Sequence, residues 1–377
     1  MNECADTAGF SGGRAGALLP VGFRDRLPPA AEAASQLVRI VVDTFAGHGY
    51  ERVAPPLVEH ETSLARWLGK PLGTALFRSP DPTSGEALAL RPDITGQIAR
   101  IAATRLSAAP RPLRLAYAGP VLRARAGQLD PSRELTQAGA ELIGTDSIAA
   151  LAELIGAAIE ALSAAGVTNI SVDLTTPELV ADLAASRWPV ADLASLVAAL
   201  DSKDWGALES PETRPYRALL QAAGPAETAL ACLKAIAPDL TARLAELVAI
   251  LPQVRVTIDP TERHGFEYQS WVGVSLFGDA GGQPLAREIG RGGAYRVRHP
   301  DGADEPAAGV SLYVDALVDA GLGGSPRRRL FLPQGTPGAT AASLRKEGWA
   351  TVSALSGMDS SEGCSHVWNG TVAVAKD

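Results

Sequence analysis

Cysteine and histidine are scarce in this chain. Its 377 residues include three cysteines and five histidines. The cysteines (Cys4, Cys232 and Cys364) are far apart and form no CxxC pair, and the histidines show no HExxH or similar spacing. Zinc sites and disulfide frameworks need such residues at short, defined spacings. We therefore expect no metal, no cofactor held by these residues, and the reducing environment of the cytoplasm.

The chain also lacks long uninterrupted apolar runs. Residues 1–17 contain Glu3, Asp6 and several glycines without the apolar stretch of a signal peptide, and we expect them to form a flexible tail. The alanine-rich segment 148–165 is interrupted by Glu153 and Glu160, which is not typical of a membrane span. These patterns predict a cytoplasmic protein with no membrane partner.

Positive charge is in deficit, because the formal net charge is −8 at pH 7. Proteins that grip nucleic acids usually carry a basic face, since neutralising phosphates supplies much of their affinity. The one dense basic run is Arg327-Arg328-Arg329, directly before an apolar run, and we interpret it as a solvated strand edge. The sequence therefore predicts no nucleic-acid partner.

Core-forming residues are plentiful: 46% of the chain is hydrophobic and 20% is charged, which predicts a sizeable core. We expect a helix from Pro28-Pro29 to Gly47, and further helices over 95–106, 148–165 and 311–320. The whole region from 147 to about 250 has a helical pattern. Strands are expected at 50–53, 76–77, 87–90, 113–117, 121–125, 134–141, 254–258, 267–276 and 285–289. Clustered strands linked by hairpins favour an α+β fold with an antiparallel sheet.

Short segments between residues 18 and 320 form an ordered set: LPVGFRD at 19–25, GYERVAPPLVE at 49–59, LRPDIT at 90–95, and YAGPVLR at 117–123 followed by 133–141. In that order they resemble the leader, motif 1, the LRPEGT segment and motif 2 of histidyl-tRNA synthetases, a class II aminoacyl-tRNA synthetase family. The resemblance implies an antiparallel sheet flanked by helices over 18–326, with a helical insertion at about 177–250. It also implies dimerisation through motif 1. The glycine-rich run 290–293 resembles the loop before motif 3. The segment 327–377 is then a truncated C-terminal β-α-β unit.

Polar residues in these segments suit a free amino acid. Acceptors for an ammonium group are available on Asp93, Thr95 and Gln137. The Arg123 guanidinium can donate two parallel hydrogen bonds to a carboxylate. Glu141 lies on the same strand face as Gln137, where a carboxylate accepts from an imidazole N–H. The resemblance implies that histidine is bound by Asp93, Thr95, Arg123, Gln137, Glu141 and Tyr268.

Two simpler interpretations stay open for these residues. Asp93, next to a proline, is a common helix N-cap, and Thr95 is a common first-turn residue. Glu141 and Arg123 would equally form an ion pair across neighbouring strands. The joint pattern, rather than any single residue, favours a binding pocket.

The chain departs from the family where adenylate chemistry occurs. Motif 2 has Arg125 where the family has an acidic residue, and the RGLDYY segment reads HGFEYQ, with His264 in place of the catalytic arginine. Arg263 is one position away, but adjacent strand side chains point to opposite faces. Ala316 stands where an arginine clamps ATP. Since phosphate chemistry needs such cations, we expect no catalytic residues.

A retained amino-acid pocket with lost ATP contacts resembles the synthetase relatives that regulate ATP phosphoribosyltransferase in histidine biosynthesis. The resemblance implies a non-catalytic subunit that pairs with a short-form catalytic subunit, responds to L-histidine as allosteric effector, and self-dimerises within a hetero-oligomer. The alternatives are a divergent histidyl-tRNA synthetase and another synthetase-derived, ATP-dependent enzyme.

Overall fold

A computed structural model describes residues 19–68, 76–125, 131–252, 254–263, 269–324, 328–356 and 359–376. The chain divides into two units, Met1–Gly323 and Gly324–Asp377. His264 and Tyr268, two of the residues named above, lie outside the described part of the chain.

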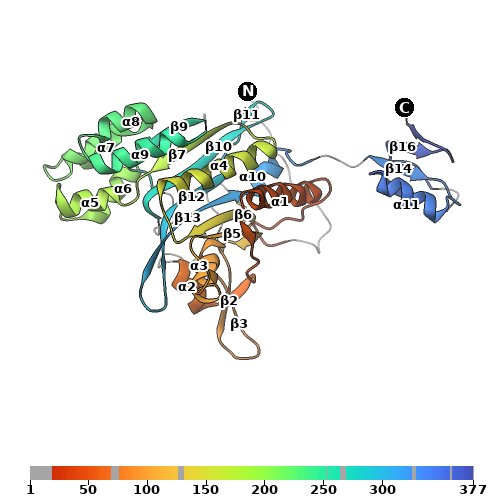
Figure 1. Ribbon diagram of the computed structural model, residues 1–377, viewed down its shortest axis with the longest axis horizontal. Coiled ribbons are helices and arrows are strands. Elements are labelled where there is room, and N and C mark those ends of the chain that lie inside the picture. The colour runs from red at the N-terminus through yellow and green to blue at the C-terminus, as the bar shows by residue number, and fades with distance from the viewer. Residues whose placement is uncertain are drawn as a thin grey trace, which may run out of the picture. The chain divides into compact units, whose positions relative to one another are not determined.

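The first unit is built on a ten-stranded sheet in the order β1-β5-β6-β13-β12-β10-β7-β9-β8, with β11 paired to β10 (Figure 1). Only β1 with β5 and β7 with β9 run parallel; the other pairs are antiparallel. This confirms the α+β class. The strands are β1 (Glu51–Arg52), β5 (Leu113–Leu122), β6 (Glu134–Ile143), β13 (Asp304–Tyr313), β12 (Gly290–Arg298), β10 (Gln269–Ala280), β11 (Gln283–Pro284), β7 (Thr168–Thr175), β9 (Arg255–Asp259) and β8 (Gly224–Pro225).

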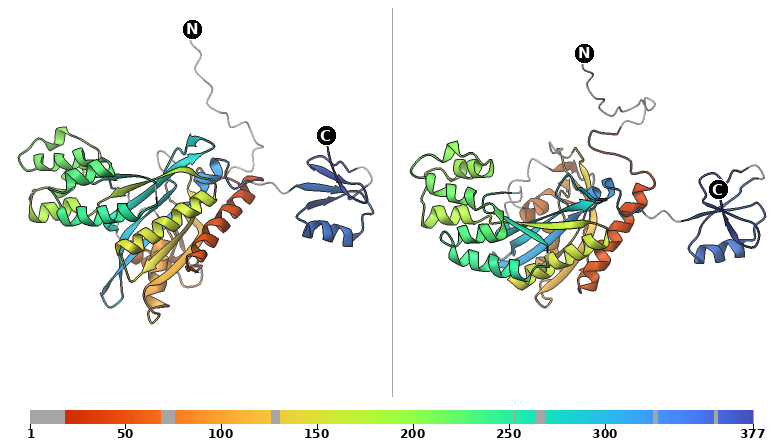
Figure 2. Two further views of the ribbon diagram at one scale, coloured as in Figure 1. Left: turned by 45° about the horizontal axis from the view of Figure 1, so that its top comes forward. Right: turned by 90° about the horizontal axis from the view of Figure 1, so that it is seen from above.

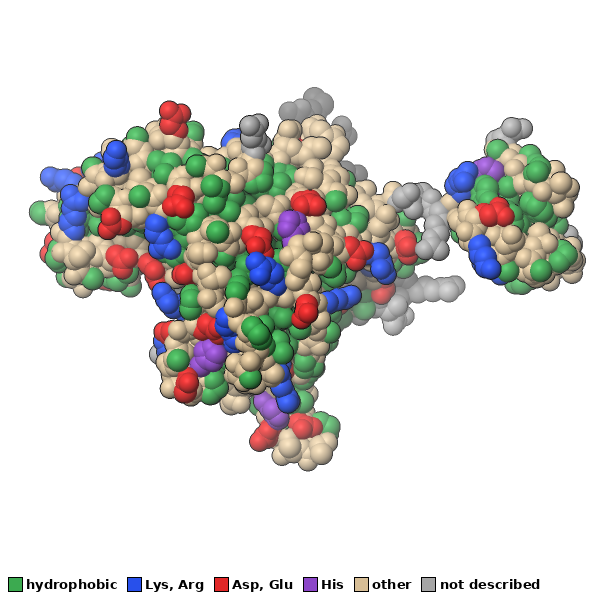
Figure 3. Space-filling model, viewed as in Figure 1, with side chains coloured by type: hydrophobic (Ala, Val, Ile, Leu, Met, Phe, Trp, Pro, Cys, Tyr) green, Lys and Arg blue, Asp and Glu red, His purple; other side chains and the backbone are tan. Residues whose placement is uncertain are grey.

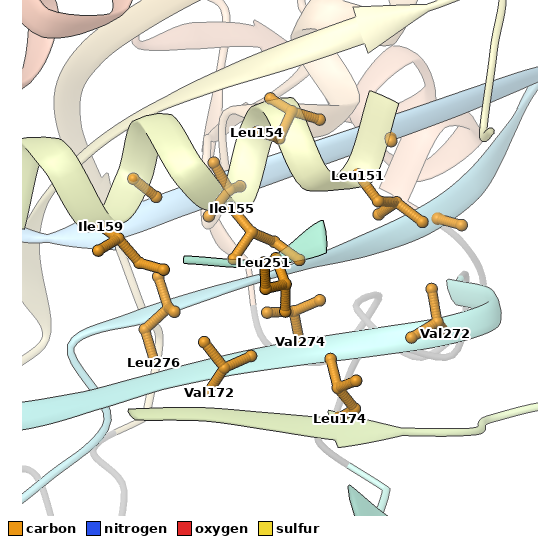
Figure 4. Packing of buried hydrophobic residues seen from close by; sticks show 14 of the residues in the cluster. Leu151, Leu154, Ile155, Ile159, Val172, Leu174, Leu251, Val272, Val274 and Leu276 are labelled. Atoms are coloured by element: carbon orange, nitrogen blue, oxygen red, sulfur yellow. The ribbon is translucent and has the colours of Figure 1, made fainter. Parts of the chain in front are cut away.

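One face of this sheet is covered by α1 (Ala30–Gly47), α4 (Ile148–Ala164) and α10 (Val314–Asp319) (Figures 1 and 2). Helix α4 begins at Ser147, whose hydroxyl accepts from the Ala150 amide, a typical N-cap. Its apolar stripe, including Leu151, Ile155 and Ile159, points at the sheet (Figure 4). Alternate strand residues pack against this stripe, among them Val172, Leu174, Val274 and Leu276.

The opposite face carries a smaller layer. A three-stranded sheet of β2 (Val58–His60), β4 (Ala87–Leu90) and β3 (Phe77–Pro80) lies beside α2 (Glu61–Leu68) and α3 (Thr95–Thr104). Ala99, Ala102 and Ala103 of α3 pack on Tyr295 and Val297 of β12. The small alanine side chains let α3 approach the sheet closely, so its first turn projects over β6.

Between β7 and β9 the chain forms a helical insertion at one end of the sheet (Figure 2). It consists of α5 (Leu179–Ser186), α6 (Leu193–Asp201), α7 (Arg217–Ala222), α8 (Ala226–Leu233) and α9 (Pro238–Ile250), with 3-10 turns at Gly206–Leu208 and Arg214–Tyr216. Among the described residues, no helix has the length and apolar character needed to cross a membrane.

The second unit has the strand order β15-β14-β16-β17, with one helix. Arg329 lies in β14, which pairs on both sides, so the expected strand-edge position of the arginine run was wrong. The Arg328 guanidinium carbon lies 4.5 Å from the centre of the Trp349 ring, a stacking contact instead. The elements are β14 (Arg329–Leu332), α11 (Gly338–Lys346), β15 (Ala350–Ser353), β16 (His366–Trp368) and β17 (Ala373–Ala375).

Several element predictions in the first unit were wrong. Strand β7 lies inside the region 147–250 that was expected to be helical, because the alanine-rich helices around it dominate the periodicity. Residues 285–289 are not a strand; β12 begins only at Gly290 and runs through the glycines that had suggested a loop. Ser311–Tyr313 end β13, and only Val314–Asp319 of the expected 311–320 helix is helical.

Leu154→Ala tests this core. Leu154 of α4 is 1% exposed, so truncation removes packing and leaves a cavity that the surrounding helix and sheet cannot fill. We expect a loss of about 2–5 kcal/mol in the free energy of unfolding, measured by urea denaturation. Leu193→Ala, at a side chain that is 38% exposed, is the control and should cost less than about 1 kcal/mol. Equal losses would mean that α4 does not pack as described.

Candidate functional site

A row of glycines crosses the face of the large sheet that lies opposite α1 and α4. The strand register aligns Gly309, Gly293 and Gly273 on β13, β12 and β10, with Glu141 of β6 at one end and Thr175 of β7 at the other. A Cβ added to Gly309 would lie 1.6 Å from Glu141 Oε2. Gly309 is therefore required, because the Glu141 side chain lies across the backbone of the neighbouring strand.

Asp93, Gln137 and the start of α3 form one hydrogen-bonded group. The Gln137 amide nitrogen donates to Asp93 Oδ2 (2.8 Å) and to Ser311 Oγ (2.7 Å), while its oxygen accepts from the Ile94 amide (2.9 Å). Asp93 Oδ1 accepts from the Thr95 amide (2.7 Å). The N-cap position of α3 is Ile94, so the interpretation of Asp93 as the N-cap residue was wrong, although Asp93 accepts from the first amide of the helix and lines the pocket.

Glu141 is held by two tyrosines. Tyr117 and Tyr295 donate to its two carboxylate oxygens at 3.0 Å and 2.9 Å, and the Tyr117 hydroxyl lies 2.7 Å from Ser311 Oγ. Tyr117 is fully buried, and Tyr295 and Ser311 are nearly so. The alternative ion pair with Arg123 was wrong: Glu141 lies opposite Leu115, whereas the Arg123 amide bonds to Arg133 O beyond the far end of β5.

Burial decides the charge state of this pocket. Desolvation raises the pKa of Glu141 from 4.5 to about 8, even though the hydrogen bonds from Tyr295 and other donors lower it. Burial likewise raises the pKa of Asp93, with the Gln137 and Thr95 hydrogen bonds opposing. Within the described residues, no lysine or arginine forms an ion pair with either carboxylate. The pocket therefore favours a ligand that brings a cation or strong N–H donors.

The cavity bounded by these residues is narrow, about 20 Å³, room for roughly one water molecule. The Gln269 side chain lies over the glycine row, since a Cβ on Gly273 would approach its oxygen to 2.6 Å. The cavity is lined by Asp93, Thr95, Glu141, Gln269, Arg291, Gly292, Gly293, Tyr295, Gly309, Ser311 and Tyr313.

A wider cleft of about 1220 Å³ adjoins the narrow cavity, and the two share Arg291 and Tyr313. Arg123 lines this cleft and not the narrow cavity. Tyr313, on the wall that the two cavities share, lines the same cleft as Arg123. Of the proposed histidine ligands, the structure thus brings Asp93, Thr95, Gln137 and Glu141 together, with Arg123 at the cleft beside them.

Of the degenerate catalytic positions, the structure places one, Ala316, in the cleft. Ala316 lines the cleft, where it offers a methyl group, and Arg125 is exposed. Arg263 does not replace an arginine at either cavity: its guanidinium donates to Pro177 O (3.0 Å) in the insertion. Arg287 and Arg291 form ion pairs with Asp319 (3.0 Å) and Glu288 (2.5 Å) at the cleft. His264 is not among the described residues.

Sequence reasoning missed Tyr117, Tyr295 and Ser311, which complete the polar cluster. Tyr117 was inside a quoted motif, but its partner Glu141 is on another strand. Tyr295 follows the glycine-rich run that had been interpreted as a loop, so its strand alternation with Gly293 was overlooked. In the described part of the chain, no cluster of three or more His, Cys, Asp or Glu side chains is arranged to hold a metal.

Comparisons with known proteins agree with this architecture. A family model described as histidyl-tRNA synthetase matches residues 22–317. Histidyl-tRNA synthetase from Nostoc sp. PCC 7120 superposes with a TM-score of 0.72 at 17% identity, covering 91% of this chain and 87% of that one. The fold is thus that of the histidyl-tRNA synthetase class.

Closer relatives carry a more specific name. "ATP phosphoribosyltransferase regulatory subunit" from Paramagnetospirillum magneticum is 45% identical, over 90% of this chain and 91% of its own length. The protein of the same name from Rhodospirillum centenum is 42% identical, over 94% and 95%. The structure named ATP phosphoribosyltransferase regulatory subunit/histidyl-tRNA synthetase from Bacillus halodurans C is 26% identical, with a TM-score of 0.75 over 89% of this chain and 92% of that one. The chain belongs to the family of ATP phosphoribosyltransferase regulatory subunits.

Gly309→Ala tests the glycine row. Because the new methyl group would overlap Glu141 Oε2, either the carboxylate or β13 must move, and we expect a destabilisation of about 1–3 kcal/mol in urea unfolding. Gly156→Ala is the control: it lies in α4 with nothing near its Cβ position, so it should be neutral or stabilising by up to about 1 kcal/mol. A neutral Gly309→Ala would show that Glu141 does not lie across β13.

Glu141→Gln tests the buried carboxyl. Between the ordinary pKa of 4.5 and the folded value of about 8, the folded protein keeps a proton that the unfolded chain has lost. The stability that Glu141 contributes is therefore present below pH 4.5 and is lost as pH rises towards 8, by about 1.4 kcal/mol per unit in the steepest part. Relative to Glu141→Gln, the wild-type free energy of unfolding should fall over this window. Parallel pH curves for the two proteins would contradict the raised pKa, and Glu246→Gln, an exposed site, should follow wild type.

Proposed function

We propose that this chain is the non-catalytic regulatory subunit of ATP phosphoribosyltransferase, and that its narrow pocket binds L-histidine as feedback effector. It would act with a short-form catalytic subunit at the first step of histidine biosynthesis. The observation that carries the proposal is the contrast between the two cavities: Asp93, Gln137 and Glu141 are hydrogen-bonded around the narrow cavity, whereas the adjoining cleft has Ala316 where the resemblance expects an arginine that clamps ATP.

The chemistry of the pocket matches histidine group by group. Asp93 and Gln137 present acceptors for the ammonium group, and Glu141, with the two tyrosines behind it, presents an acceptor for the imidazole N–H. Arg123, at the mouth towards the cleft, is the donor for the carboxylate. A cationic ligand would also relieve the cost of burying two carboxylates without a counter-charge, which favours the charged form of both.

Binding requires the narrow cavity to open. A histidine does not fit in about 20 Å³, so the Gln269 side chain has to leave the glycine row. Gln269 is the first residue of β10, and the preceding segment includes Tyr268, the remaining proposed ligand. Displacement of the Gln269 side chain by the ligand would link occupancy of the pocket to the conformation of β10.

The proposed role also fits a lack of catalysis and of nucleic-acid binding. Adenylate formation needs oriented cations on the phosphates, and at the cleft Arg287 and Arg291 form ion pairs with Asp319 and Glu288. On the face seen in Figure 3, lysine and arginine side chains are scattered among acidic ones and form no continuous basic patch. We place the protein in the cytoplasm, as a self-dimer through the motif 1 region within a hetero-oligomer.

The test is an assay with ATP, phosphoribosyl pyrophosphate and a purified short-form catalytic subunit from the same organism. Adding this chain should raise the rate, and histidine should then lower it. Glu141→Gln and Arg123→Ala should retain stimulation but need at least about tenfold more histidine for inhibition, because each loses a charge-assisted contact. Glu246→Gln should behave as wild type.

Two results would reject the proposal. If the chain does not stimulate a cognate catalytic subunit, the regulatory function is rejected. The next measurement is then histidine-dependent adenylate formation, monitored by pyrophosphate exchange. Stimulation with unchanged histidine sensitivity in both variants would retain the partnership and remove histidine from this pocket.

A further inference from the structure

The helical insertion carries a third cavity, which shares no lining residue with the two described above. This groove has a volume of about 400 Å³ and is formed by α5, the start of α9 and one residue of β10. We call it the acidic groove. It is lined by Glu178, Leu179, Asp182, Leu183, Ser186, Ile236, Ala237, Pro238, Asp239, Leu240, Arg243 and Trp271.

Its charge is unbalanced. Glu178, Asp182 and Asp239 bring three carboxylates to the groove, against one cation, Arg243. None of these four side chains forms an ion pair with another described residue. Burial and the nearby Asp182 raise the pKa of Glu178, as expected where carboxylates crowd without enough positive charge.

The one cation is engaged with the floor of the groove. The Arg243 guanidinium carbon lies 3.7 Å from the centre of the Trp271 ring, so it stacks on the indole and is not paired with a carboxylate. Trp271 is 7% exposed, and its indole N–H has no acceptor in the described part of the chain. Buried donors without partners are rare in folded proteins, and each calls for a specific explanation.

We propose that the acidic groove docks a basic segment of the catalytic subunit, with a lysine or arginine side chain among the three carboxylates. The inference rests on the proposed function, since it names the surface through which that function is exerted. A groove of about 400 Å³ holds one long side chain and its adjoining backbone, and its lining includes Trp271, whose indole N–H has no acceptor in the described part of the chain. An aromatic anchor surrounded by complementary charges is typical of the energetic centre of an interface.

The position of the groove relates it to the histidine pocket. Trp271 and Gln269 lie two residues apart on β10. One lines the acidic groove and the other covers the glycine row. A displacement of the start of β10 by histidine would therefore move Trp271. The resulting coupling is reciprocal, so binding at either site would change the affinity of the other by the same factor.

Charge reversal in the groove tests the docking. Asp182→Lys with Asp239→Lys should raise the Kd for the purified short-form catalytic subunit at least about tenfold at about 50 mM salt, and less at about 300 mM salt. The control is Glu227→Lys with Glu246→Lys. It makes the same change in net charge at exposed positions of α8 and α9 that do not line the groove, and it should change Kd less than about threefold.

The outcomes separate the two proposals. If wild type neither binds nor stimulates the catalytic subunit, the proposed function fails. If wild type binds and the groove variant binds equally well, or if both double variants weaken binding equally, the groove is not the docking site and the function stands. Thermal unfolding checks that the variants are folded. If the charge-reversal variant is not folded, the test uses the double variant Asp182→Asn with Asp239→Asn, which should still weaken binding.

Discussion

The structure depends on burying the Glu141 carboxylate across a strand that has no side chain to obstruct it. Three aligned glycines leave the space, two tyrosines supply the hydrogen bonds, and Ser311 and Gln137 connect the group to Asp93 at the start of α3. The contacts come from β5, β6, β12, β13 and the start of α3, so the order of strands in the sheet is what assembles the pocket. A buried acid without an ion-pair partner is costly, and under the proposed function a positively charged ligand would offset that cost.

Much of the fold was predictable because it follows from local signals. Ser147 and the apolar stripe behind it predict α4, and Gly47 marks the end of α1. Predictions failed where burial overrides local preference. Gly290, Gly292 and Gly293 look like a loop, yet they are strand residues because their neighbours approach too closely for a Cβ: one on Gly292 would lie 2.3 Å from Gly309 O. Strand β7 was hidden by the alanine-rich helices on either side.

The site was predictable in part for a similar reason. Asp93, Thr95, Gln137 and Glu141 belong to short motifs, so a resemblance carries them together, and the sheet register then places them in one pocket. Tyr295 and Ser311 come from strands far along the chain, and their role becomes visible only when Glu141 is seen between them. Arg123 belongs to the same motif as Tyr117, yet the end of β5 directs it to the neighbouring cleft.

The two adjoining cavities share only Arg291 and Tyr313 among their lining residues. Under the proposed function, recognition of the amino acid and contacts to phosphates therefore fall to almost separate sets of side chains. Point mutations can remove the second set while the first is retained. Such a division would let one scaffold serve both as an aminoacyl-tRNA synthetase and as a regulatory subunit.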